Sequence, residues 1–143
     1  MGCGKRKIDT YFRSPTIKAL SLVGPSGSRI PSGEKTLEVR RWHPELEPWE
    51  DLLIVQNGRF LHNEGEEDAD GLGVAIVRVK AVRPFVPADM QAACASYFAE
   101  GWLAWELSHV RSITPPVRVR AARGIYTVEI ELPAPYRGSR LKG

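Results

Sequence analysis

The chain is broken into short apolar segments, rich in β-branched residues, that end at glycine- and proline-containing turns. Segments of this length and alternation are typical of β-strands. The strand candidates are residues 17–23, 36–40, 51–56, 73–85, 102–107 and 124–132, and a slip in the alternation of 73–85 predicts a bulge. A helix is predicted at residues 87–96, and residues 25–33 fit a short irregular helix or a turn.

Five or six short strands with so little helix predict an α+β fold built on a small closed β-barrel with one or two flanking helices. Closure would leave no strand edge unpaired. The 143 residues are enough for one domain. We expect a basic arm at residues 1–15, the barrel at 16–133 and a basic tail at 134–143.

Composition narrows the protein class. The two cysteines, Cys3 and Cys94, provide neither a disulfide framework nor a zinc site. No stretch approaches the roughly 20 apolar residues of a membrane span, and the first residues lack the apolar core of a secretory signal. We therefore expect an intracellular monomer that does not contact a membrane, nuclear in a eukaryote and otherwise cytoplasmic.

Charge is segregated along the chain. Residues 1–42 carry nine Lys and Arg against three Asp and Glu, residues 43–70 carry one against nine, and residues 71–143 carry ten against five. Basic blocks of this kind favour an anionic partner such as a nucleic acid. The alternative is that the acidic segment is simply solvated surface.

The segment Gly33–Trp42 holds the densest set of functional side chains. The strand period of two places Glu38 and Arg40 on one side, with Lys35 and Trp42 close by in sequence. A carboxylate accepts from the amino edge of a base, arginine donates to phosphate or to a base, and tryptophan stacks on a base. The alternative is an exposed strand face on which these charges pair with one another.

This segment resembles the ASCH domain family, whose members have a PUA-like barrel. The family pattern Gly-x-Lys-x-x-Glu-x-Arg is matched in full by Gly33–Arg40. Further segments that look like family strands are Ala19–Val23, Asp51–Val55, Val82–Phe85 and Trp105–Arg111, so that the resemblance covers about residues 17–132. One departure is Pro25-Ser-Gly, where relatives often carry an aromatic residue after the proline.

The resemblance implies a protein that handles nucleic acid, RNA in preference to DNA, in a cleft of the barrel. The binding residues that it implies, with Trp42 added from the stacking argument, are Lys35, Glu38, Arg40, Trp42, Ser108 and Arg111. Ser108 and Arg111 belong to the later motif and would form the facing wall. No cofactor is expected.

The resemblance also raises hydrolysis in the same cleft, with Lys35, Glu38 and Ser108 as candidate catalytic residues. One branch of the family hydrolyses acetylated cytidine with a lysine and a threonine three residues later. Here Glu38 stands in place of that threonine, which counts against the amidohydrolase activity. Thr36 and Ser108 are the hydroxyls in the two motifs that could substitute.

A ribonuclease is the other hydrolytic alternative. Cleavage of RNA needs a base, an acid and a cation near the phosphate. Glu38 is the candidate base, Lys35 or Arg40 the cation, and His43 or His109 the acid. If the protein is a ribonuclease, it could also use a divalent metal ion.

The basic arm carries a second pattern. Ile8, Tyr11 and Phe12 have the spacing of the PIP box, the peptide motif that docks on the replication sliding clamp, although Lys5 replaces its glutamine. On a short 3₁₀ turn these side chains would form one apolar plug. The sequence therefore predicts a sliding-clamp partner. The alternative is an arm that packs on its own barrel.

Two tryptophans of the late strand also have predicted positions. Trp102 and Trp105 are three residues apart, so they face opposite sides of a strand. We expect one of them in the core and the other at the edge of the cleft.

Overall fold

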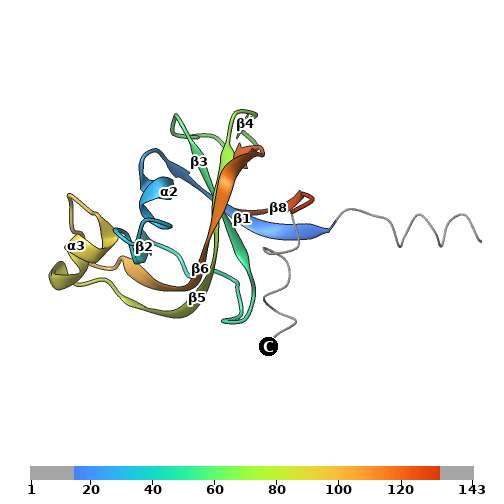
Figure 1. Ribbon diagram of the computed structural model, residues 1–143. Helices are drawn as coiled ribbons and strands as arrows, with labels where there is room; N and C mark the ends of the chain where they lie inside the picture. Colours follow the sequence, from blue (N-terminus) through green and yellow to red (C-terminus); the bar gives the residue numbers. More distant parts are fainter. Residues whose placement is uncertain (1–14, 133–143) are drawn as a thin grey trace, which may run out of the picture.

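The computed structural model describes residues 15–132, which form strands joined by short helices and turns (Figure 1). The strands are β1 (Thr16–Val23), β2 (Leu37–Arg40), β3 (Leu52–Asn57), β4 (Glu67–Asp68), β5 (Leu72–Pro84), β6 (Leu103–Arg118), β7 (Ala121–Ala122) and β8 (Ile125–Glu129). The helices are α2 (Ser26–Arg29), the 3₁₀ turn η1 (Pro87–Asp89) and α3 (Met90–Ala93). None of the helices in this part of the chain is long and apolar enough to cross a membrane.

The main sheet has six strands in the order β2-β6-β5-β3-β1-β8, and β4 pairs with β7 in a separate two-stranded ladder. All neighbours in the main sheet are antiparallel except β1 and β3, which are parallel. Figure 1 shows β5 and β6 curving side by side through the molecule. In this view α3 lies at the left of the molecule, and β1 and β8 lie at the right.

The sheet is open, so the predicted closed β-barrel is wrong. Strands β2 and β8 end the order and do not pair with each other. Strand β1 is hydrogen-bonded to β3 along Lys18–Val23 and to β8 along Thr16–Leu20, and among the described residues no ladder joins its last residues to β2. Instead, the side chain of Arg40 on β2 reaches the Ser21 carbonyl of β1, at 3.2 Å. The gap between β1 and β2 is therefore bridged by side chains rather than by a ladder.

The helix predicted at residues 87–96 is shorter than expected. A 3₁₀ turn begins at Pro87, and one α-helical turn follows and ends at Ala93. Cys94 then adopts a left-handed conformation with φ of 54°, which terminates the helix. Because Ala93 and Ala92 pack in this turn, they bring its backbone carbonyls against the start of β2.

The long hairpin of β5 and β6 contains three register shifts, which confirms the predicted irregularity in residues 73–85. Strand β6 runs to Arg118, well past the predicted end at residue 107. Residues 108–118 include two prolines, and their apolar residues Val110, Ile113 and Val117 do not alternate with a period of two. Pairing with β5 maintains the strand there.

The core lies on both sides of the main sheet. Trp105, Leu20 and Ile54 belong to the cluster on one side, and Leu53 and Ile76 to the cluster on the other. A third, smaller cluster fixes α3 against β2 and β6 and contains Leu37, Phe85, Ala93 and Ala104. This third cluster positions the backbone around the site described next.

Candidate nucleic-acid interface

A large open cleft lies where β1, β2, α3 and the loop after β3 meet. Its volume is about 1260 Å³. Its lining comes from segments far apart in sequence, and its polar and aromatic members are Ser21, Ser26, Lys35, Glu38, Arg40, Trp42, Asn57, Arg59, Phe60, Glu64, Ser96, Tyr97, Trp102 and Arg123. The cleft therefore combines positive charge with aromatic surface.

Three charged side chains from the predicted motif form an ion cluster in the cleft. Lys35 Nζ lies 3.2 Å from Glu38 Oε1, and Arg40 Nε lies 2.7 Å from Glu38 Oε2. Lys35 and Glu38 are only 6% and 5% exposed. The sequence left open that these charges pair with one another on an exposed strand face. They do pair, but Lys35 and Glu38 are buried rather than exposed.

Local backbone structure positions this cluster. Gly33 has φ of 87°, a left-handed conformation that glycine adopts without strain, and it turns the chain into β2. Thr36 then donates its backbone N–H to Ala92 O at 2.8 Å, which holds the segment against α3. As a result Lys35 Nζ donates to Ala93 O at 2.7 Å.

Arg40 is the most accessible member of the cluster, with 25% of its side chain exposed. Its Nε binds Glu38 and its Nη2 donates to Ser21 O. Within residues 15–132 no hydrogen bond engages Nη1 of Arg40, so this donor is available to a ligand. Its guanidinium carbon also lies 5.9 Å from the ring centre of Trp42.

Aromatic side chains line the walls of the cleft. Trp42 is 38% exposed and meets the buried Trp105 edge-on, with ring centres 5.1 Å apart. Tyr97, which is 65% exposed, packs against Trp102 at 5.7 Å. Trp105 lies in the core and Trp102 lines the cleft, which confirms the opposite orientations predicted for this pair.

Sequence reasoning missed the cleft residues Asn57, Arg59, Phe60, Tyr97 and Arg123. The sequence predicts the loop after β3 as a polar, acidic segment and assigns it no site residue. A signal was present in it, because Phe60 is a large aromatic residue in a polar run, and it is 68% exposed. Arg59 pairs with Glu66 at 2.6 Å, which orders this loop.

Ser108 and Arg111 do not line the cleft. Ser108 Oγ lies 3.5 Å from Arg78 O, and Arg111 Nη2 lies 2.7 Å from Asp51 Oδ1. Burial opposes ionisation of Asp51, but the hydrogen bonds from Arg111 and Arg78 outweigh it and lower the pKa of this carboxyl. The predicted facing wall of the cleft is therefore formed by other residues.

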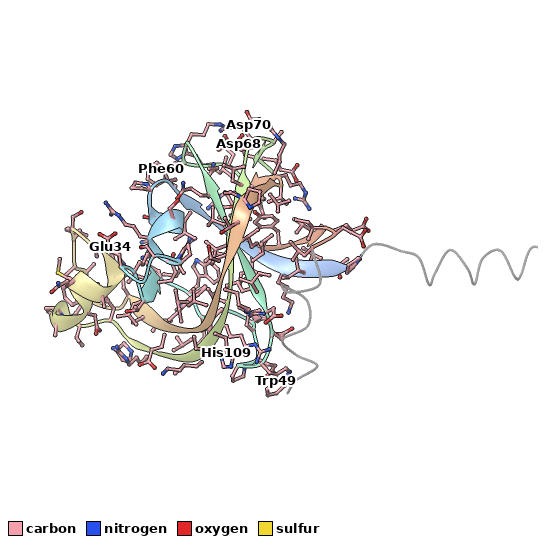
Figure 2. The ribbon with its side chains drawn as sticks, viewed as in Figure 1. Glu34, Trp49, Phe60, Asp68, Asp70 and His109 are labelled. Atoms are coloured by element: carbon pink, nitrogen blue, oxygen red, sulfur yellow. The ribbon has the colours of Figure 1, made fainter. Side chains whose placement is uncertain are left out.

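The two candidate histidines are also outside the cleft. His43 is exposed and its Nδ1 lies 2.9 Å from Pro44 O. His109 lies at the lower end of the molecule in Figure 2, well away from Phe60. Thr36 is exposed and is not part of the cleft lining. Of the predicted site, the structure thus brings together Lys35, Glu38, Arg40 and Trp42.

Two further expectations concern metals and the chain ends. Within the described range no group of three or more His, Cys, Asp and Glu side chains is arranged to hold a metal ion. The arm residues Ile8, Tyr11 and Phe12 lie outside the described residues, as does the tail at 134–143. The sliding-clamp partner therefore stays a prediction.

Comparison with known proteins identifies the family of this chain. The crystal structure of ASCH from Zymomonas mobilis has the same fold, at 17% identity and a TM-score of 0.53 over 71% of this chain and 73% of that chain. A serine-to-alanine variant of it matches over 92% and 98% of the two chains, at 13% identity and a TM-score of 0.53. No curated protein matches the chain. The ASCH domain profile matches residues 20–117, more than half of the sequence, and the chain belongs to the ASCH domain family.

Proposed function

We propose that this protein binds RNA, holding a single strand or an unpaired base in the cleft. The observation that carries the proposal is the position of the Lys35, Glu38 and Arg40 cluster in a cleft whose walls present Trp42, Phe60 and Tyr97. Arginine donates to phosphate and base edges, and exposed aromatic rings stack on unpaired bases. Single-stranded RNA offers both kinds of group at once.

Hydrolysis in the same cleft is less well supported. The candidate acids His43 and His109 and the candidate hydroxyl of Ser108 are not part of the cleft lining. Both carboxylate oxygens of Glu38 are already paired with cations, which opposes a role as a free base. Binding without chemistry therefore accounts for more of the geometry.

Arg40→Ala is expected to weaken RNA binding by about 1–3 kcal/mol and to reduce the salt dependence of binding by about one ion. The reason is that Arg40 holds the free donor of the cluster. Fluorescence anisotropy with labelled single-stranded RNA over a salt series measures both quantities, and a gel of the recovered RNA reports any cleavage.

The matched control for this prediction is Arg118→Ala. Arg118 is exposed, pairs with Asp70 and lies outside the cleft. It should change affinity far less than Arg40→Ala. Equal affinity of Arg40→Ala and the parent, with an unchanged circular dichroism spectrum, would contradict the assignment of the cleft. If the parent cleaves the RNA and a Glu38 variant does not, hydrolysis would replace binding as the proposed function.

Tyr97→Ala and Phe60→Ala are each expected to cost about 1–3 kcal/mol of binding free energy, because stacking on one base is lost. The salt dependence should stay as in the parent, since no charge is removed. Trp49→Ala is the control, because Trp49 is also 66% exposed but lies at the lower end of Figure 2, outside the cleft. An equal loss in all three variants would argue against stacking in the cleft.

A further inference from the structure

Asn57 is a buried amide in the lining of the cleft. It is the last residue of β3 and lies opposite Val23 of β1. Its backbone carbonyl accepts from Gly24 N at 2.9 Å, and the residue is only 5% exposed. The backbone of Asn57 is thus held against the end of β1, and its side chain is held as well.

The orientation of the Asn57 amide follows from its neighbours. Nδ2 donates to Arg59 O at 2.6 Å and to Asp68 Oδ2 at 3.3 Å. Both neighbours are acceptors only, because one is a carbonyl and the other a carboxylate. A flipped amide would set its oxygen against both of them, so Nδ2 points to the loop and Oδ1 points away from it.

Oδ1 of Asn57 is left without a partner in the described chain. Among these residues the one fully enclosed side-chain polar atom that lacks a hydrogen bond is Nε1 of Trp105. Oδ1 is therefore not fully enclosed, and the open space next to Asn57 is the cleft that it lines. The cleft presents a fixed acceptor at this point.

The acceptor and the cationic donors line the same cleft. Arg40 Nη2 binds the carbonyl of Ser21, and Asn57 is opposite Val23, two residues further along the same strand. Two residues of β-strand span about 7 Å. Because Arg40 and Asn57 line the same cleft, one bound RNA strand can meet the guanidinium and the amide oxygen together.

We propose that Asn57 Oδ1 selects RNA bases that carry an exocyclic amino group, such as adenine or cytosine, over uracil. An amino group donates to the fixed oxygen, whereas the carbonyl oxygen that uracil has in its place would face it lone pair to lone pair. Nδ2 is already engaged, so the contact uses the acceptor alone. This inference rests on the proposed RNA binding in the cleft.

The test compares short single-stranded RNAs of equal length that differ only in the amino group. The full chain is titrated with oligo(adenosine) and with the same oligomer of purine riboside, which lacks the 6-amino group. We expect the adenosine oligomer to bind about three- to tenfold more tightly, the range for one hydrogen bond. Asn57→Ala should bring this ratio to about one.

Asp68→Ala is the control, because it removes a loop contact of Nδ2 and leaves Oδ1 in place. It should change the affinity for both oligomers alike and keep the ratio. If Asn57→Ala does not fold, the side-chain amide NMR signals of Asn57 in the parent chain replace it. They should shift with the adenosine oligomer and not with the purine riboside oligomer.

The outcomes separate the two proposals. The role of Asn57 would be overturned if the parent chain bound both oligomers equally or if Asn57→Ala left the ratio unchanged. It would also be overturned if the amide signals of Asn57 responded to both oligomers. RNA binding itself would stand in all three cases. An absence of binding to any RNA would overturn the proposed function itself.

Discussion

Glu38→Ala is expected to lower the free energy of unfolding by about 3–5 kcal/mol, which is the usual cost of removing one partner from a buried ion pair. Glu38 is the common partner of Lys35 and Arg40, and without it the buried ammonium of Lys35 keeps, within residues 15–132, only the carbonyl of Ala93. For a domain of this size the melting temperature should fall by roughly 10 °C. Thermal and urea unfolding followed by circular dichroism measure this change.

Two variants serve as controls for this prediction. Glu34→Ala removes a carboxylate that is 61% exposed and lies 3.8 Å from Arg29, so its effect should be about 0.5 kcal/mol or less. Glu38→Gln keeps the shape and an acceptor oxygen, and it should lose less stability than Glu38→Ala. A loss below about 1 kcal/mol for Glu38→Ala would contradict the prediction, because it would mean that water solvates Lys35 and Arg40 as well as Glu38 does.

This expectation changes how the cleft is best probed. Lys35 is buried and paired with Glu38, so Lys35→Ala would alter stability and RNA binding together. Arg40 is partly exposed and has a free donor, so its removal reports mainly on binding. A comparison of the two variants must therefore include their unfolding free energies.

Asp51→Asn is expected to destabilise the protein at neutral pH by about 1.5–3 kcal/mol, the range for hydrogen bonds to charged groups. Asp51 accepts from Arg78 at 3.0 Å and from Arg111 at 2.7 Å, and its side chain is 13% exposed. It ties the start of β3 to the middle of the β5–β6 hairpin. Asp70→Asn, at an exposed pair with Arg118, is the matched control and should have little effect.

The same carboxylate predicts a pH dependence. Burial opposes its ionisation, but the two arginines lower its pKa below the ordinary value of 3.8. A lowered pKa means that the stabilisation is present above that value and is lost as the pH falls through the folded-state pKa. The stability difference between the parent and Asp51→Asn should therefore shrink below about pH 4. A difference that stays constant down to the acid transition would rule out this role.

Local patterns in the sequence were enough for part of the fold and of the site. The period-two spacing of Glu38 and Arg40 correctly predicted that they share one side of a short strand and meet. Apolar alternation likewise located most strands, because a strand that buries one face must repeat every second residue. The family was also recognisable from the motif around these residues.

The later motif shows where local pattern fails. Ser108 and Arg111 have family-like neighbours in sequence, yet they lie away from the cleft. The register shifts between β5 and β6 decide which side chains of β6 face the cleft, and they depend on a partner strand some 30 residues away in sequence. No pattern within β6 alone carries that information.

Strand pairing and the full cleft were decided by the tertiary structure. The sequence predicted a closed barrel, but β1 pairs with β3 and β8 and has no ladder with β2 among the described residues, so the sheet stays open there. That gap is where Asn57, Phe60 and Tyr97 join the Lys35 cluster from separate segments. Short-range alternation determines which face of a strand is buried, whereas the choice of neighbours depends on satisfying every backbone hydrogen bond across the whole chain at once.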